Sequence, residues 1–249
     1  TDSLPALFTI DEVETVFHEF GHALHGLLTK CHYPSVSGTN VARDFVETFS
    51  QFNENWAFQP EILAEYAKHY DKAAGTHDCA GFFQRVKVDG SLVAKINNAR
   101  KFNQGFMTSE LCAASILDMK WHELTEEDLA KLSEGDQAAN VAEFEKKVCR
   151  EMGLIDEIIP RYRTTYFNHI FNSGYSAGYY SYLWAEVLDK DAFEYFQQQG
   201  IYNPEVALKF RQTFLEKGGS EEPMTLYLSF RGAQTDPGAL LRARGLTEK

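Results

Sequence analysis

The residues with the clearest chemical potential are His18, Glu19 and His22, which belong to the pentapeptide His-Glu-Phe-Gly-His. Two histidines four residues apart on a helix lie on one face, one turn apart, so both imidazoles can reach a single ion. The glutamate that follows the first histidine projects about 100° further round the helix, beside the ion rather than onto it. This spacing is typical of a hydrolytic zinc site, in which the free carboxylate accepts a proton from the attacking water. The motif therefore predicts that His18 and His22 bind zinc and that Glu19 is the general base.

A third ligand must come from another element, because catalytic zinc commonly keeps two histidines, one glutamate and an open position. Asp44 and Glu47 lie about one turn apart on the next predicted helix, and the Pro/Gly-containing loop before it allows antiparallel packing. Spacing favours Glu47, whereas Asp44 is a competing ligand or a residue that orients a ligand histidine. We interpret the nearby His25 and His32 as packing or surface residues. Gly21 is small, and we expect it to leave room beside the ion.

Two alternatives accompany this prediction. An H-E-x-x-H pentapeptide arises by chance in roughly a few per cent of chains of this size, and its histidines can simply decorate a helix surface. If the site is real, we expect one Zn²⁺ per chain, although manganese or cobalt could take its place.

Helix signals dominate the chain that must position these residues. Thr9 with Glu12, and Thr125 with Asp128, form capping boxes that start two helices. The second helix should bury a stripe of Phe45, Phe49, Phe52 and Trp56. Residues 73–90 read as a loop or short hairpin, 168–182 are unassigned, and Pro60 marks the break after the second helix. We predict a mainly α fold with minor β in one domain, 1–249, with helices at 13–28, 41–58, 91–104, 108–121, 126–132, 139–151, 182–197 and 203–217, and a loop, a short helix and a tail after residue 218.

Composition excludes several classes of function. The formal net charge of -12, without a Lys/Arg stripe, argues against binding nucleic acid. No apolar run is long enough to span a bilayer. Asp2 and Pro5 interrupt any signal-peptide pattern, and the four cysteines are scattered. We therefore expect a cytoplasmic protein with free thiols.

The motifs resemble the catalytic region of the thimet oligopeptidase family of zinc metallopeptidases, and the resemblance covers nearly the whole chain. Residues 73–90 depart from the family pattern. Family members are also much longer, so the chain resembles a C-terminal catalytic portion. The matching segments are His-Glu-Phe-Gly-His-Ala-Leu-His-Gly (18–26), Ser-Gly-Thr-Asn-Val-Ala-Arg-Asp-Phe-Val-Glu (37–47), Asn-Glu-Asn-Trp (53–56), Lys-Phe-Asn-Gln-Gly-Phe (101–106), Leu-Asp-Met (117–119), His-Ile-Phe (169–171), Gly-Tyr-Ser-Ala-Gly-Tyr-Tyr-Ser-Tyr-Leu-Trp (174–184), Gly-Gly-Ser (218–220) and Phe-Arg-Gly (230–232).

The resemblance implies roles for residues that spacing does not single out. It implies a zincin-like fold with Glu47 as the third zinc ligand. It also implies that His169, Tyr175 and Tyr182 bind substrate and the transition state. The tyrosines lie in a glycine-rich stretch, and such a stretch can flex over a substrate while a phenol donates a hydrogen bond to an oxyanion. Ordinary aromatic packing is the alternative for each tyrosine.

The resemblance also implies short peptides as substrates. The chain's ending and the loop before Asp44 favour a peptidyl-dipeptidase that releases C-terminal dipeptides. An endo-acting oligopeptidase is the alternative. The expected partner is the missing N-terminal half of the same polypeptide, without which the chain could be a zinc- and peptide-binding helical fragment that is inactive.

Overall fold

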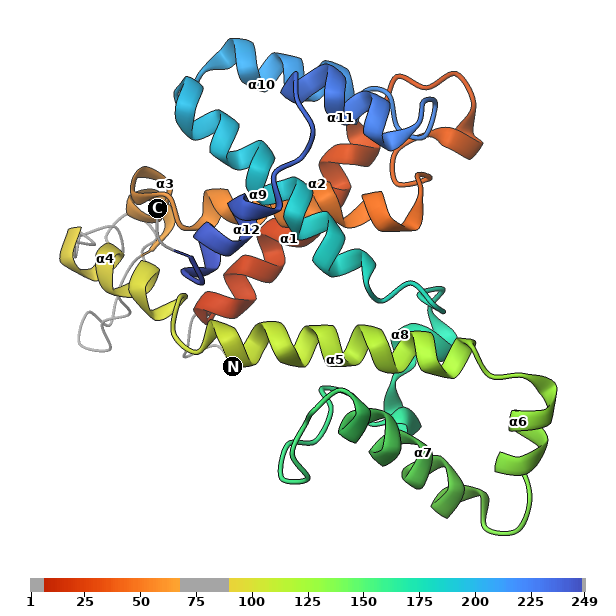
Figure 1. Cartoon of the computed structure of the whole chain (residues 1–249). Coiled ribbons are helices and arrows are strands. Elements are labelled where there is room, and N and C mark those ends of the chain that lie inside the picture. The colour runs from red at the N-terminus through yellow and green to blue at the C-terminus, as the bar shows by residue number, and fades with distance from the viewer. Residues whose placement is uncertain (1–6, 68–89, 248–249) are drawn as a thin grey trace, which may run out of the picture.

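A computed structural model describes residues 7–67 and 90–247, and helices make up most of this part of the chain (Figure 1). No strand occurs within these two ranges, so the predicted mainly α fold is confirmed. The loop or hairpin predicted at 73–90 lies almost wholly outside the described residues. The helices are α1 (Ile10–Leu27), α2 (Arg43–Ala57), α3 (Pro60–Tyr66), α4 (Gly90–Ala99), α5 (Gln104–His122), α6 (Glu126–Leu132), α7 (Gln137–Glu151), α8 (Asn168–Asn172), α9 (Ser181–Gln199), α10 (Pro204–Phe210), α11 (Pro223–Arg231) and α12 (Pro237–Arg244), with 3-10 turns η1 (Pro34–Val36) and η3 (Thr164–Tyr166) and a π-helical turn η4 (Arg211–Leu215).

Local sequence explains where several helices begin. The capping box at Thr9 is formed as predicted, because its hydroxyl accepts from the Glu12 amide at 3.2 Å and the Glu12 carboxylate accepts from the Thr9 amide at 2.7 Å. The capping box at Thr125 is also present. Pro60 was predicted to mark the break after the second helix, and α2 does end before it, at Ala57. Pro60 itself is the first residue of α3, a short helix that was not predicted, since proline suits that position. Asn103 adopts a left-handed φ of 57° between α4 and α5, so the helix predicted to reach residue 104 ends earlier.

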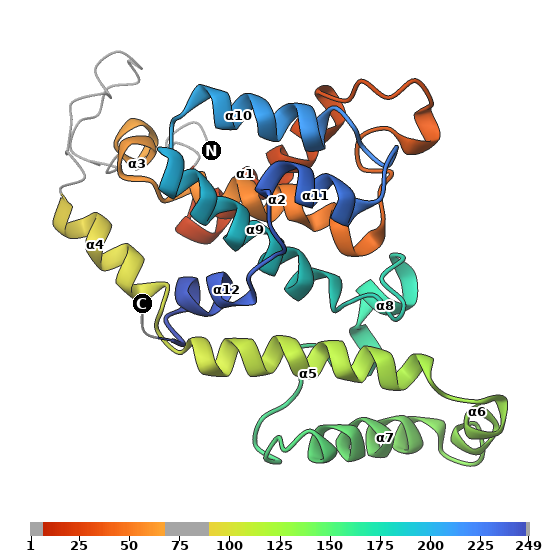
Figure 2. The same ribbon diagram turned by 45° about the horizontal axis from the view of Figure 1, so that its top comes forward.

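One hydrophobic core lies where α2 packs between α1, α9 and the C-terminal helices (Figure 2). Phe45, Phe49 and Phe52 are buried in it, as predicted for the second helix, and Trp56 is partly buried. The Phe52 ring stacks on Phe210 at 4.3 Å between centroids. This packing fixes α2, and with it the face that carries Glu47.

A smaller cluster lies where α5 passes the segment around α8. Ala114 of α5 packs there with Phe167, Ile170 and Tyr179. The long helix α5 begins beside the C-terminal helix α12 and ends beside this region. Helices α6 and α7 lie on the opposite side of α5 (Figures 1 and 2). The chain between α8 and α9 therefore joins the two packed regions.

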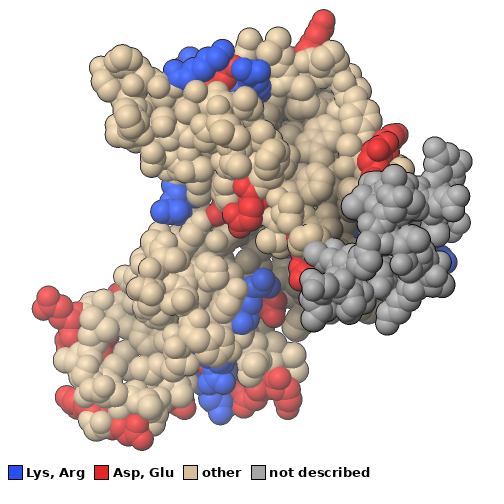
Figure 3. Space-filling model, turned by 180° about the vertical axis from the view of Figure 1, so that it is seen from behind, with Lys and Arg blue, Asp and Glu red and all other residues tan. Residues whose placement is uncertain are grey.

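Several apolar side chains of α1 are exposed. Val16 and Phe20 are 51% and 54% exposed, and Leu27 is 75% exposed, so these apolar residues do not pack on the partner helix α2. Among the described residues no helix combines the length and apolar character needed to cross a membrane. On the face seen in Figure 3, basic and acidic side chains lie in small separate groups, one acidic group lies where the surface is hollowed between its upper and lower parts, and several others lie along the rim of the lower part.

Candidate active site

The structure brings His18, His22 and Glu47 together. The Nε2 atoms of both histidines lie 3.3 Å from Oε2 of Glu47, and one ligand atom from each residue lies within 4.8 Å of the others. In the described part of the chain these are the one group of three or more such side chains suited to hold a metal ion. Zinc bonds of about 2.0–2.1 Å in a tetrahedron place ligand atoms about 3.3–3.4 Å apart. The donor set and both 3.3 Å distances therefore fit a zinc ion.

Gly21 lets α1 and α2 approach closely enough for this convergence. A Cβ added at Gly21 would lie 2.6 Å from the carbonyl oxygen of Phe49 and 2.6 Å from Cα of Ser50. Glycine at this position therefore accommodates the backbone of α2. The expectation that it leaves room beside the ion is not what the structure shows, since the space is filled by α2.

Glu47 is a buried carboxylate held by several donors. It is 3% exposed, and its Oε2 accepts from the Ser50 hydroxyl at 2.8 Å. The Tyr175 hydroxyl donates to Oε1. Burial alone would raise the pKa of Glu47, but hydrogen bonds from His18, His22, Tyr175 and Ser50 lower it well below its ordinary value. The carboxylate is therefore ionised, as a metal ligand must be.

Glu54 is a site residue that the sequence reading missed. Its Oε1 lies 2.6 Å from Nδ1 of His18. Although burial alone would lower the pKa of His18, the hydrogen bonds with Glu47 and Glu54 raise it to about 10. A carboxylate on Nδ1 orients the ring so that Nε2 points toward Glu47, which is a common arrangement around metal-binding histidines. The available signal was spacing, because Glu54 follows Glu47 by seven residues, about two helical turns on the same face.

The other acids and histidines near the motif lie elsewhere. Asp44, the competing ligand, accepts from the Tyr180 hydroxyl at 3.1 Å and is outside the group of three. His25 is fully buried against Phe49, with ring centroids 4.3 Å apart, in agreement with a packing role. The ring of His32 stacks edge-on against its neighbour Tyr33.

Glu19 follows His18 on α1 and is exposed. About 100° separates successive side chains on a helix, so its carboxylate lies beside the histidine face, open to solvent. This placement is compatible with the role of general base, which stays a prediction.

The three residues chosen by resemblance form one aromatic cluster. The rings of Tyr175 and Tyr182 stack at 5.1 Å, and His169 lies 6.2 Å from each. Burial first, then a hydrogen bond to Tyr175, raises the pKa of Tyr182 far above its ordinary value, so its hydroxyl keeps its proton. Burial, together with the charge of Arg161, lowers the pKa of His169. Through the contact between Tyr175 and Glu47, the cluster adjoins the candidate metal site.

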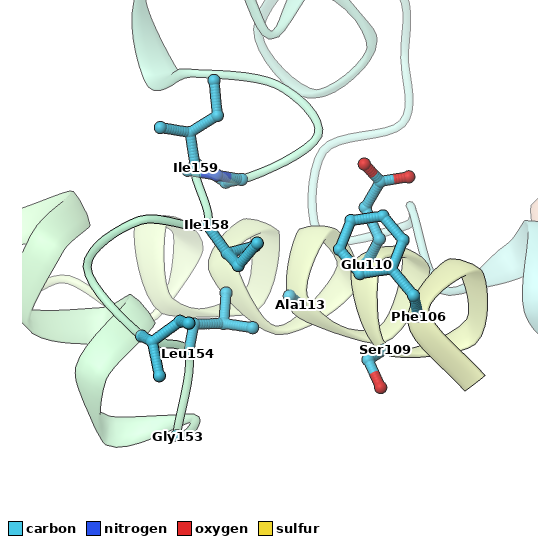
Figure 4. Close-up of a pocket in the computed structure, with 10 residues that line it drawn as sticks. Phe106, Ser109, Glu110, Ala113, Gly153, Leu154, Ile158 and Ile159 are labelled. Atoms are coloured by element: carbon cyan, nitrogen blue, oxygen red, sulfur yellow. The ribbon is translucent and has the colours of Figure 1, made fainter. Parts of the chain in front are cut away.

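A separate cavity of about 160 Å³ lies between the first half of α5 and the loop 153–160 (Figure 4). Phe106, Leu154 and Ile158 are among its mostly apolar lining. The carboxylate in the lining, Glu110, is paired with Arg161 at 3.1 Å. The cavity therefore suits contact with an apolar side chain rather than catalysis.

The chain is similar to proteins that are named as peptidases. The chain is 43% identical to dipeptidyl carboxypeptidase of Escherichia coli over 97% of its own length, and 38% identical to oligopeptidase A of the same organism, also over 97%. It is 30% identical to a thimet-like oligopeptidase of Dictyostelium discoideum over 99% of its length. The chain spans about a third of the length of these relatives, or 33%, 33% and 34%. The sequence model of peptidase family M3 matches residues 1–246, and the chain belongs to this family.

Proposed function

We propose that this chain is the metal-binding catalytic part of a zinc peptidase that cleaves short peptides. The observation that carries the proposal is the convergence of His18, His22 and Glu47 within 4.8 Å. Membership of peptidase family M3 supports it, as does the fit of the 3.3 Å spacings to zinc. The active-site residues of the following paragraphs are part of this proposal.

His18, His22 and Glu47 would hold the ion, with Glu54 orienting His18. When bound, zinc supplies Lewis acidity, which makes water a stronger acid and polarises a carbonyl oxygen. Three carboxylate and imidazole ligands leave a position open for this chemistry.

The remaining steps belong to side chains of the chain. Glu19 accepts a proton from the attacking water and passes it to the leaving nitrogen. The Tyr182 hydroxyl, which stays protonated, donates to the oxyanion that develops at the scissile carbonyl. Tyr175 and His169 belong to the same cluster and bind substrate. In this structure the Tyr175 hydroxyl donates a hydrogen bond to Glu47.

Substitution of Glu19 tests the proposal. In the zinc-loaded protein, Glu19→Gln should keep one zinc per chain and lose roughly 10²–10⁴-fold in kcat on a fluorogenic peptide. His22→Ala should lose both zinc and activity. Asp11→Asn, an exposed acid on the same helix, is the matched control and should behave as the unaltered protein. Full turnover by Glu19→Gln would refute the mechanism.

We further propose release of C-terminal dipeptides, for which a group must recognise the free carboxylate of the substrate. Arg43 is exposed one turn before Glu47, and its guanidinium carbon lies 4.7 Å from the centre of the Tyr175 ring. A planar guanidinium binds a carboxylate through two hydrogen bonds. The 43% identity to a protein named dipeptidyl carboxypeptidase supports this mode.

Paired peptides with free and amidated C-termini separate this mode from endopeptidase action. The unaltered enzyme should prefer the free carboxylate, and Arg43→Gln should reduce that preference roughly 10–100-fold, the value of a lost charged hydrogen bond. Arg150→Gln, which removes a distant exposed cation paired with Asp156, is the control. Equal cleavage of both peptides by the unaltered enzyme would favour the endo-acting alternative.

We also propose that residues 1–249 act as one catalytic domain within a longer polypeptide, whose remainder covers the exposed face of α1. The length of the relatives and the exposure of Val16 and Phe20 support this view. Phe20→Ser should weaken activity of the longer polypeptide and leave the stability of residues 1–249 almost unchanged. Leu208→Ser, a 49% exposed position on α10, is the control. Equal effects of both substitutions on activity would contradict the proposed contact.

A further inference from the structure

The segment between α8 and α9, which carries Tyr175 and Tyr182, has a backbone that needs external support. Gly174 has a φ of 82°, and Ala177 has a φ of 51°, in the left-handed region. An alanine held there costs about 1–2 kcal/mol. Such a conformation persists only when surrounding contacts impose it.

Asp118 of α5 provides those contacts. It is fully buried, 59 residues earlier in the chain than Ala177. Its Oδ1 accepts from the Ala177 amide at 2.9 Å, and its Oδ2 accepts from the Tyr179 amide at 2.8 Å. His122, one turn later on α5, places Nδ1 2.9 Å from the same carboxylate. Each oxygen of the Asp118 carboxylate therefore accepts a hydrogen bond from one backbone amide of the strained segment.

These two amides lie between the active-site phenols. Tyr175 precedes them, and its carbonyl accepts from the Gly178 amide at 2.8 Å. Tyr182 follows them, and its amide donates to the Tyr179 carbonyl at 3.3 Å, at the start of α9. Moving the backbone at Ala177 or Tyr179 therefore moves the phenol hydroxyls relative to Glu47.

We propose that Asp118 is a positioning residue that holds the Ala177–Tyr179 backbone so that Tyr175 and Tyr182 face the candidate metal site. The proposal rests on the proposed function, in which these phenols act on bound peptide. Asp118 reaches no substrate, because it is fully buried on α5. It acts through the backbone alone.

The physical claim can be measured without metal or substrate. In Asp118→Asn, the side-chain NH₂ group faces one of the two amides, so that hydrogen bond is replaced by two opposed donors. Hydrogen exchange at Ala177 and Tyr179 should become faster, on the order of 10-fold. Asp191→Asn is the matched control, since Asp191 is also fully buried but accepts from the Tyr227 hydroxyl at 2.6 Å. Unchanged exchange at both amides in Asp118→Asn would overturn the proposal.

Kinetics then separate positioning from general destabilisation. The experiment uses the zinc-loaded full-length polypeptide. Asp118→Asn should lower kcat roughly 10–100-fold, as a displacement near 1 Å can do, while KM changes less. In a Tyr182→Phe background the same substitution should lower kcat less than about 3-fold, because the hydroxyl proposed to stabilise the oxyanion is already absent and only the position of Tyr175 is still affected. Full additivity of the two losses would show that Asp118 acts elsewhere.

A gentler substitution keeps the test valid if Asp118→Asn does not fold. His122→Ala removes one partner of the Asp118 carboxylate. The His122 side chain is 26% exposed, so its loss should disturb the fold less. The substitution should lower kcat by a few fold, again only when Tyr182 is intact, and its failure to do so would count against the proposal. Two different results would contradict the role of Asp118 and the proposed function. If Asp118 has no positioning role, Asp118→Asn is fully active while Glu19→Gln is inactive. If the proposed function is wrong, Glu19→Gln keeps full activity.

Discussion

Gly21→Ala is the substitution whose effect follows most directly from the structure. The new Cβ would lie 2.6 Å from the Phe49 carbonyl oxygen, 2.6 Å from Ser50 Cα and 3.1 Å from Asn53 Cβ. The first two are backbone atoms of α2, so no side chain can rotate away. Ordinary contact near 3.4 Å requires α1 and α2 to separate by about 0.8 Å. Overpacking of this kind lowers the free energy of unfolding by about 1–3 kcal/mol.

The same displacement acts on the candidate metal site. His18 and His22 lie on α1 on either side of Gly21, and Glu47 lies on α2. Metal ligands must stay within about 0.2 Å of their ideal distances. A helix separation several times larger should weaken zinc binding at least as much as loss of an orienting residue does, about 10–100-fold.

Gly26→Ala is the control for the same helix. A Cβ at Gly26 would meet no atom within 4 Å, so this change should be neutral or stabilise by up to about 1 kcal/mol. Urea unfolding would measure stability, and competition with a chromogenic chelator would measure zinc affinity. If Gly21→Ala matched Gly26→Ala in both assays, the tight α1–α2 contact would not be what holds the site together.

Two more outcomes concern the histidines of α1. Glu54→Gln should weaken zinc binding about 10–100-fold in the chelator assay, because His18 loses the carboxylate that orients it, and unchanged affinity would contradict that role. Burial, and secondarily the charge of His22, lowers the pKa of His25 to about 4, below the value near 6.5 of an unfolded chain. Stability is therefore present above pH 6.5 and lost as pH falls, by about 2 kcal/mol at pH 5. In urea unfolding of the metal-free proteins, the stability of His25→Leu should fall less between pH 6.5 and pH 5 than that of the unaltered protein. An equal fall in both proteins would exclude His25 as its source.

The chemistry of the motif could be predicted because it depends on one helix. A spacing of four residues puts His18 and His22 on one face whatever the helix packs against. Asp44 and Glu47 were harder to separate, since three residues on a helix differ by only about 60° in direction. The crossing of α1 and α2 decides between them, and that crossing depends on the close approach at Gly21.

Helix positions were predicted well where hydrophobic periodicity was strong, and poorly where single residues decide. Pro60 can end one helix or begin another, and only the packing of α3 shows that it begins one. The exposed apolar residues Val16 and Phe20 gave α1 the pattern of a helix, but the face that packs on α2 carries Gly21 and His25 instead. Hydrophobicity alone therefore does not identify the face that packs on α2.

Glu54 and Asp118 show what sequence spacing does not contain. A single acid on a helix is most often solvated, so the sequence assigned neither residue a role, although both lie in segments that match the family. Each has a partner far along the chain, His18 at 36 residues and Ala177 at 59. A buried carboxylate is tolerated only where donors meet it, because an unpaired buried charge is costly. Asp118 is fully buried and Glu54 is partly buried, and the donors that meet their carboxylates are a candidate zinc ligand and the backbone beside Tyr175 and Tyr182. The cost of removing each carboxylate from water is therefore offset when the proposed site residues are in place.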